Sequence, residues 1–158
     1  QDADRLGRQF MALLVAFACM LIAAQFRVKT IKALAPLAYL VGVLLLAAVP
    51  LWGVDINGAT RWLDLPGLPR FQPSELMKLA VPLTVAAYLS GTLLPPKFNY
   101  LLASFTIILL PCGLIVIQPD LGTSLLVATS GLLVIWLAGL QWRYVFGAVL
   151  GVVASAWQ

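Results

Sequence analysis

The sequence predicts an all-α fold, a polytopic bundle of transmembrane helices, and two observations carry this prediction. Hydrophobic residues make up 62% of the 158 residues and charged residues only 10%, against roughly 25% charged residues in soluble proteins. The few charges also leave long apolar runs, and about 20 apolar residues suffice to cross a ~30 Å hydrocarbon core. None of these runs alternates apolar and polar residues as the strands of a membrane β-barrel do. The uncharged runs are 9–26, 33–54, 79–96, 98–119, 121–142 and 144–158.

Prolines, glycines and short charged segments mark the expected limits of the helices within these runs. A polar lead-in precedes the first helix, and a basic loop over 27–33 follows it. Pro50 and Gly53 are expected to close the second helix, before an external polar loop over 53–73. A single transmembrane domain over 1–158 then holds about six helices, at 10–26, 34–49, 74–89, 100–117, 121–137 and 144–158.

Both ends of the chain predict a fragment of a longer protein. The chain begins at Gln1 without a methionine and stops at Gln158 inside an apolar run.

The residue types exclude two kinds of chemistry within this chain. It has no histidine, so imidazole general-base catalysis and histidine-ligated zinc are ruled out. Cys19 and Cys112 lie inside apolar runs, where we expect them to be small packing residues. No cofactor motif is evident.

The distribution of charge predicts which loops share a side of the membrane. Loops 27–33, 90–99 and 139–143 carry five basic and no acidic residues, which is the cytoplasmic pattern. The loops of the other side carry the other five basic residues and all six acids. The polar segment 53–78 and Asp120 are therefore expected to meet on the external side.

The segment 58–78 is the first candidate site, because it holds five of the sixteen charged residues. Pro73 suits the first turn of a helix, and the helix dipole favours Glu75 there. Lys78 lies on the same face, so the two side chains are expected to pair. If the pair is buried, removing one partner costs about 3–5 kcal/mol. The alternative is an interfacial ion pair that only fixes a helix end.

The tripeptide Gln118-Pro119-Asp120 is the second candidate site. Pro119 ends one helix, and Asp120 is placed to cap the next by accepting from the amide of Gly122 or Thr123. A plain cap is one interpretation. Against it, Asp120 is the only acid between residues 76 and 158, and serine or asparagine would cap without the desolvation cost of a carboxylate. Together with Arg61, Glu75 and Lys78 it would form a site suited to an anionic head group.

These two segments carry a resemblance to a known family. The stretches GATRWLDL, RFQPSELMKLAVPL and QPDLGTSLLVATSGL closely resemble the RodA/FtsW (SEDS) family of polytopic cell-wall proteins. QPSE and the downstream GLQWR look more like the RodA (elongation) branch than the FtsW (division) branch. The family has ten transmembrane helices, and this chain resembles the second through the start of the seventh.

The resemblance implies a peptidoglycan glycosyltransferase, a lipid II polymerase of the rod-shape machinery. It implies a multi-pass protein of the bacterial cytoplasmic (inner) membrane that works on the outer face. The implied partners are lipid II, a class B penicillin-binding protein, elongation-complex membrane proteins and membrane lipid, with no nucleic acid. Transfer from undecaprenyl diphosphate needs cations, or a divalent metal such as Mg²⁺ or Mn²⁺, beside the departing diphosphate.

The resemblance also implies a set of cavity residues and a missing one. Glu75, Lys78 and Asp120 match the family's polar central cavity. The acid usually taken as catalytic lies in a large external loop after the seventh helix, so no catalytic residue is expected here. The turn at 66–69 is slightly longer than the family's usual link. With their polar neighbours, the substrate-binding candidates are Arg61, Trp62, Gln72, Glu75, Lys78, Gln118, Asp120 and Thr123.

Two other classes of function fit the same residues. A lipid II flippase or transporter also places paired charges in a cavity within the membrane. A non-catalytic scaffold of the cell-wall machinery would use the charges only to fix helix packing.

Overall fold

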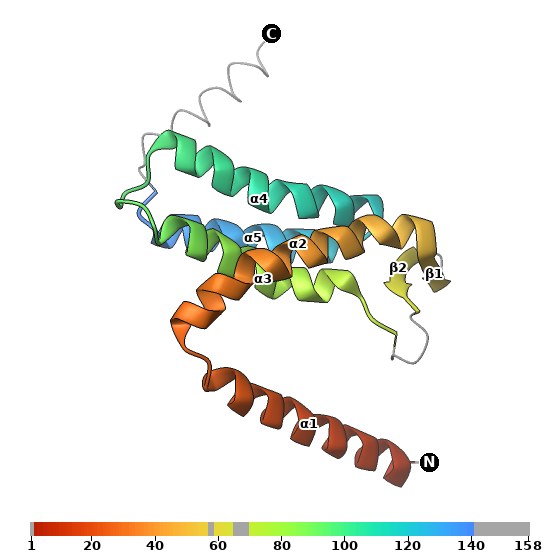
Figure 1. Ribbon diagram of the computed structural model, residues 1–158. Coiled ribbons are helices and arrows are strands. Elements are labelled where there is room, and N and C mark those ends of the chain that lie inside the picture. Colours follow the sequence, from red (N-terminus) through yellow and green to blue (C-terminus); the bar gives the residue numbers. More distant parts are fainter. Residues whose placement is uncertain (1, 57–58, 65–69, 141–158) are drawn as a thin grey trace. The chain divides into compact units, whose positions relative to one another are not determined.

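The computed structural model describes residues 2–56, 59–64 and 70–140 (Figure 1). The chain divides into two compact units, Gln1–Ile31 and Lys32–Gln158. The helix expected over 144–158 and the turn at 66–69 lie outside the described residues. Five helices and a two-stranded hairpin occupy the described ranges, in the order α1, α2, β1, β2, α3, α4, α5.

Helix α1, which spans Asp2–Ala24, belongs to the first unit. It begins eight residues before the expected start at residue 10, because the polar lead-in is helical as well. The sequence has acids at positions 2 and 4, and acidic residues favour the start of a helix. The apolar side chains of α1, Phe17 and Cys19 among them, are exposed, as in a helix that faces lipid.

Helix α2, Val28–Trp52, is longer than expected at both ends. The predicted basic loop over 27–33 is wrong from Val28 onward. Lysine is a good helix former and no glycine or proline interrupts the first turns, so Lys29 and Lys32 lie in the helix. Pro50 does not close the helix either, and the turn that contains it continues to Trp52.

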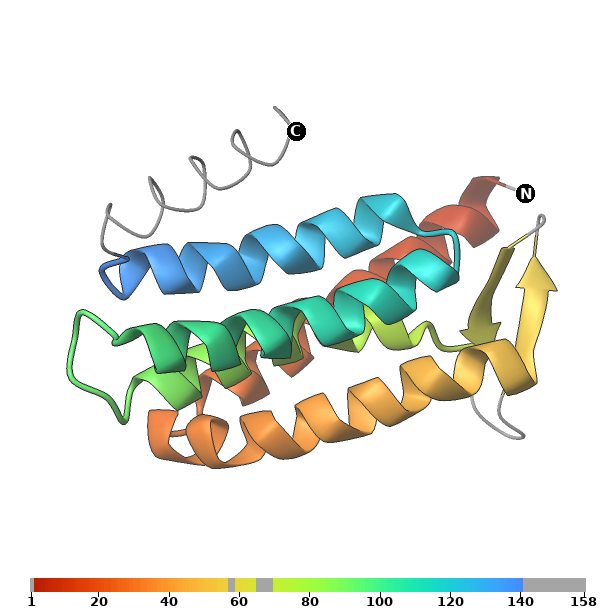
Figure 2. The ribbon, with the colours of Figure 1, turned by 90° about the horizontal axis from the view of Figure 1, so that it is seen from above.

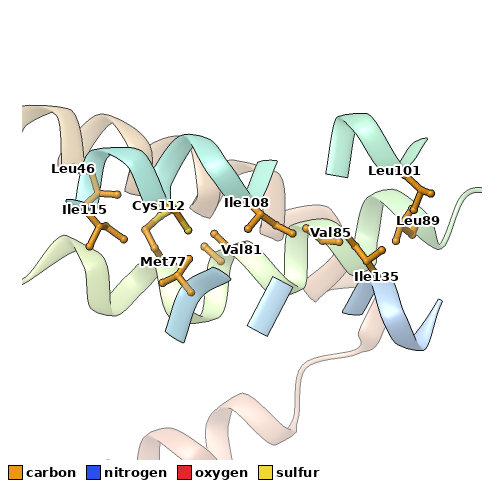
Figure 3. Packing of buried hydrophobic residues seen from close by; sticks show 12 residues of the cluster. Leu46, Met77, Val81, Val85, Leu89, Leu101, Ile108, Cys112, Ile115 and Ile135 are labelled. Atoms are coloured by element: carbon orange, nitrogen blue, oxygen red, sulfur yellow. The ribbon is translucent and has the colours of Figure 1, made fainter. Parts of the chain in front are cut away.

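Three further helices form the body of the second unit: α3, Pro73–Leu89; α4, Phe98–Ile117; and α5, Leu121–Leu137. Their bounds agree with the expected 74–89, 100–117 and 121–137 to within two residues. Each packs against the other two, and the core gathers between them, with Leu46 added from α2 (Figure 3). Cys112 is buried in this core, in the packing role expected of it. The core residues are Leu46, Met77, Ala80, Val81, Val85, Leu89, Leu101, Ile108, Cys112, Ile115, Val127 and Ile135.

A β-hairpin replaces part of the predicted polar loop, which corrects the loop prediction over 53–73. Strands β1, Gly53–Ile56, and β2, Ala59–Leu63, pair antiparallel, and Leu63 bridges to Phe71 beyond them. The sequence between the strands is Asn57-Gly58, the strongest short signal for a hairpin turn. Val54 and Ile56 alternate with polar residues beside it, so the hairpin could have been predicted.

The hairpin lies at the same end of the second unit as the turn between α4 and α5, and the α3–α4 connection lies at the opposite end (Figure 2). For these three connections, the arrangement agrees with the expected division of the loops between two sides.

The lengths of the helices fit a membrane protein. Among the described residues, α2 and α4 are long and apolar enough to cross a membrane. Helices α3 and α5 have 17 residues each, at the lower limit of roughly 17–25 residues for a spanning helix. The expected all-α membrane bundle is the observed architecture, with a small hairpin at one end.

Gly131 of α5 marks a close approach between α5 and its neighbours. A Cβ atom at this position would lie 2.6 Å from Ile108 Cγ1 and 3.2 Å from Val81 Cγ1. Both neighbours are fully buried, so they have little room to move. Gly113 of α4 is the matched contrast, because a Cβ atom there meets nothing within 4 Å.

We therefore expect Gly131→Ala to lower the thermal stability of the protein and Gly113→Ala to leave it unchanged or raise it slightly. Overpacking costs about 1–3 kcal/mol, whereas replacing an exposed helical glycine by alanine contributes roughly 0.5–1 kcal/mol. Thermal unfolding in detergent measures both. Equal melting temperatures for the two variants would contradict the close packing at Gly131.

Candidate functional site

Asp120 is the centre of the candidate site, held between α4 and α5. Its carboxylate caps α5 by accepting from the backbone amide of Thr123, with 3.1 Å between Oδ1 and N. This is one of the two amides expected from the sequence. The other oxygen, Oδ2, accepts from Gln72 Nε2 at 3.2 Å. Both oxygens of a side chain that is 12% exposed are therefore held in place.

Arg61 brings a positive charge from the hairpin to this carboxylate. Its Nη1 lies 3.8 Å from Asp120 Oδ2, and its Nη2 donates to the carbonyl oxygen of Pro119 at 2.6 Å. The Nε atom is buried without a hydrogen-bond partner in the described part of the chain. A guanidinium carries five N–H donors, so Arg61 keeps donors that its neighbours in the described residues do not use.

Gln72 and Arg61 reach Asp120 because the hairpin and the start of α3 lie beside the α4–α5 turn (Figure 2). Gln72 is the residue before the Pro73 start of α3, and Pro73 suits that first position because it has no N–H to satisfy. Ser74, next in the helix, is buried, and its Oγ has no partner among the described residues. The start of α3 thus holds one hydroxyl that the described residues leave unused.

Glu75 and Lys78 form the expected pair one turn into α3. Lys78 Nζ lies 2.7 Å from Glu75 Oε1. The side chains are 33% exposed for Lys78 and 54% for Glu75, so the cost assumed for a buried pair does not apply. Within the described residues, each of the two side chains contacts only the other by hydrogen bonding, and none of their polar atoms reaches Asp120.

The remaining predicted site residues divide between the site and the scaffold. Gln118 is buried, and its amide nitrogen donates to the carbonyl oxygen of Leu46 in α2, so it faces the bundle rather than Asp120. Trp62 is half-buried in β2, where it pairs with Val54. The structure therefore brings together Arg61, Gln72, Asp120 and the Thr123 amide, and adds the Pro119 carbonyl, which sequence reasoning missed.

The cluster offers a divalent metal a single carboxylate, and Mg²⁺ is usually bound by one or two carboxylates together with substrate phosphates. Mg²⁺ and Mn²⁺ are bound by several oxygen ligands, and no group of three acidic, cysteine or histidine side chains gathers in the described ranges. Asp120 is the only carboxylate of the cluster, and both of its oxygens already accept N–H donors. The positive charge at this point comes from the Arg61 side chain.

The cluster is suited to hold an anion beside a fixed positive charge. Asp120 orients Arg61 and Gln72, and Lys78 supplies a second, half-exposed cation from the second turn of α3. Charge-assisted bonds from such donors to phosphate oxygens are about twice as strong as neutral ones.

Comparison with known proteins gives this arrangement a family context. The family model of the FtsW/RodA/SpoVE cell cycle proteins matches residues 2–157. The peptidoglycan glycosyltransferase MrdB of Escherichia coli K12 is 41% identical over 154 residues, which cover 98% of this chain and 41% of that protein. A probable peptidoglycan glycosyltransferase FtsW of Burkholderia thailandensis is 33% identical over 163 residues, covering 98% and 33%.

Solved structures show the same fold. The rod shape determining protein RodA of Thermus thermophilus superposes with a TM-score of 0.74 at 33% identity, covering 94% of this chain and 49% of that one. A chain of a peptidoglycan synthase complex superposes with a TM-score of 0.78 at 33% identity, covering 94% and 44%. The chain thus spans less than half the length of these relatives.

The exposure of the Glu75–Lys78 pair leads to a prediction about stability. We expect Lys78→Ala and the double variant Glu75→Ala/Lys78→Ala to unfold within about 1 kcal/mol of the original protein, because exposed ion pairs contribute roughly 0–1 kcal/mol. Denaturation in detergent tests this. A loss of about 3 kcal/mol or more for Lys78→Ala that the double variant reverses would mean that the pair is buried in the native protein.

Proposed function

Because this chain belongs to the FtsW/RodA/SpoVE family of cell cycle proteins, we propose that its protein is a peptidoglycan glycosyltransferase of the elongation branch. It polymerises lipid II by transferring glycan from undecaprenyl diphosphate. The names of the relatives from Escherichia coli and Thermus thermophilus support this proposal. The chain spans 41% of the Escherichia coli relative, so the activity is proposed for the whole protein.

The observation that carries the proposal is the charged cluster at the hairpin end of the bundle. Arg61, Gln72 and Asp120 come from three separate segments and meet at one point. Charged groups in a membrane protein are costly and mark sites of function by default. The cluster provides what an anionic diphosphate needs, a cation beside a carboxylate that is only 12% exposed.

The transfer makes one bond and breaks one. The C1–O bond between the sugar and the diphosphate breaks, a hydroxyl oxygen of the acceptor sugar bonds to C1, and the hydroxyl proton goes to a base. Negative charge develops on the departing diphosphate, where positioned cations lower the barrier. We assign this role to Arg61, with Lys78 as the second cation.

Asp120 is assigned a positioning role rather than that of the base. Its two oxygens accept from Thr123 and Gln72 and lie beside Arg61, whereas a general base must reach the acceptor hydroxyl and stay free to take its proton. No described residue is assigned as the base.

The remaining elements of the proposal concern the setting of the reaction. We place the protein in the bacterial cytoplasmic membrane as a multi-pass protein, with the hairpin end outside. The basic residues of the opposite loops support this orientation. A class B penicillin-binding protein is the proposed partner, supported by the likeness to a chain of a peptidoglycan synthase complex.

A neutral variant of Asp120 tests the site. Asparagine caps a helix about as well as aspartate, so Asp120→Asn is expected to insert and unfold as the original protein does. It removes the charge that orients Arg61, and we expect most of the lipid II polymerisation by the purified full-length protein to be lost. Asp120→Ala is expected to add a stability defect of roughly 1 kcal/mol.

Asp64→Asn is the matched control, because Asp64 pairs with Arg70 in an exposed position outside the cluster. It should polymerise normally. Normal polymerisation by Asp120→Asn would leave Asp120 as a helix cap only. A purified full-length protein that moves lipid II across vesicles but forms no glycan would overturn the proposal in favour of a transporter.

The orientation has its own test. A cysteine at Asp64 should react with a membrane-impermeant thiol reagent in spheroplasts, and a cysteine at Asn99 should not react until the membrane is opened. Cys19, the exposed cysteine of this chain, is replaced by alanine in both variants to lower the background. The reverse labelling pattern would place the cluster on the cytoplasmic side.

A further inference from the structure

Pro50 of α2 and Pro111 of α4 each leave a carbonyl oxygen without its usual donor. A proline has no N–H to donate to the carbonyl four residues earlier. Pro50 therefore frees the carbonyl of Leu46, and Pro111 frees that of Ile107. Water is scarce inside such a bundle, so each carbonyl needs a donor from the protein.

Gln118 supplies the donor for Leu46. Its Nε2 lies 2.9 Å from the Leu46 carbonyl oxygen, and the residue is only 4% exposed. Gln118 immediately precedes Pro119 and Asp120, so the bond fastens the α4–α5 turn to α2 from inside the bundle.

A second bond fastens the same turn from the other side. Arg61 donates to the carbonyl of Pro119, and Arg61 lies in the hairpin that continues directly from the end of α2. The chain and these two hydrogen bonds thus form a closed ring. It runs along α2 into the hairpin, crosses from Arg61 to Pro119, and returns from Gln118 to α2 at Leu46. Asp120, whose carboxylate faces Arg61, directly follows the two anchored residues Gln118 and Pro119.

We propose that Gln118 is a positioning residue, which holds the α4–α5 turn so that Asp120 and the Pro119 carbonyl meet Arg61. It acts through these groups and does not bind substrate. The effect of Gln118 on polymerisation rests on the proposed function. Its effect on the position of the α4–α5 turn does not.

Gln118 both satisfies the Leu46 carbonyl and attaches the α4–α5 turn to α2. Pro50→Ala separates these two roles. Alanine at position 50 restores an N–H to the Leu46 carbonyl, so the carbonyl is satisfied without Gln118. Gln118→Met keeps the length of the side chain and removes its donor. The double variant Pro50→Ala/Gln118→Met therefore has a satisfied Leu46 carbonyl and no bond from Gln118 to α2, while the bond from Arg61 to Pro119 remains.

Three readouts on the full-length protein in detergent follow from this design. Gln118→Met should lower Tm by roughly 3–6 °C, and the double variant should recover it. Hydrogen exchange of peptides that cover 118–124 should be at least about tenfold faster in both variants than in the original protein. Lipid II polymerisation should stay about ten- to hundredfold low in the double variant despite its recovered Tm.

Tyr39 provides a matched control with the same chemistry away from Asp120. Its hydroxyl donates at 3.0 Å to the carbonyl of Ile107, which Pro111 has freed. Tyr39→Phe should lower Tm, and Pro111→Ala/Tyr39→Phe should recover Tm together with normal exchange at 118–124 and normal polymerisation.

The outcomes are distinguishable. Original exchange at 118–124 in Pro50→Ala/Gln118→Met would overturn the tether and leave Gln118 as a donor to one carbonyl. Faster exchange with unchanged polymerisation would overturn its role in positioning the reaction. If the original full-length protein formed no glycan, the proposed function would fail, and the exchange measurement alone would decide the tether.

Discussion

A backbone carbonyl in an apolar bundle needs a donor, and this requirement governs how α2 is joined to its neighbours. Among the described residues, the side chains that bond α2 to the other helices of its unit all form bonds to backbone oxygens: Tyr39 to Ile107, Thr84 to Ala35, and Gln118 to Leu46. Two of these oxygens are free because a proline lies four residues later. Pro50 and Pro111 thus each create an acceptor that one particular donor on another segment satisfies. Apolar contacts between helices are less selective, since lipid tails are as apolar as leucine.

The candidate site depends on the same kind of bond from a side chain to a distant backbone carbonyl. Arg61, Gln72 and Asp120 belong to a strand, the residue before a helix and a helix cap, and no one of these segments holds the others in place. The α4–α5 turn is fastened on one side by Gln118 and on the other by Arg61. Asp120 therefore has a scaffold role and a site role. Its cap on α5 fixes one oxygen, which leaves the other to orient Gln72 and Arg61.

The charged side chains fall into two groups that differ in burial and in how fully they are bonded. The carboxylate that lies deepest, Asp120, is fully engaged by donors, whereas Glu75 and Lys78 remain half-exposed and bonded only to each other within the described residues. A largely buried and fully engaged carboxylate suits a fixed electrostatic role, because its environment is already organised before substrate arrives. An exposed pair can exchange partners when an anion binds. Asp120 is thus suited to holding Arg61 in place, and the Glu75–Lys78 pair is suited to contacting an incoming anion.

Composition and short-range spacing were enough to predict the membrane bundle, the limits of α3, α4 and α5, the Asp120 cap and the Glu75–Lys78 pair, and the resemblance of two motifs indicated the family. The helix limits, the cap and the pair depend on neighbours three or four residues apart, where helix geometry decides the contact. The hairpin was also predictable, through Asn57-Gly58 between two short alternating segments. Three features became known only from the folded chain: Pro50 lies inside α2, Gln118 faces the bundle, and Arg61 reaches Pro119. The last two contacts join residues 72 and 58 positions apart, and no local periodicity states which distant donor a freed carbonyl or a lone guanidinium will meet.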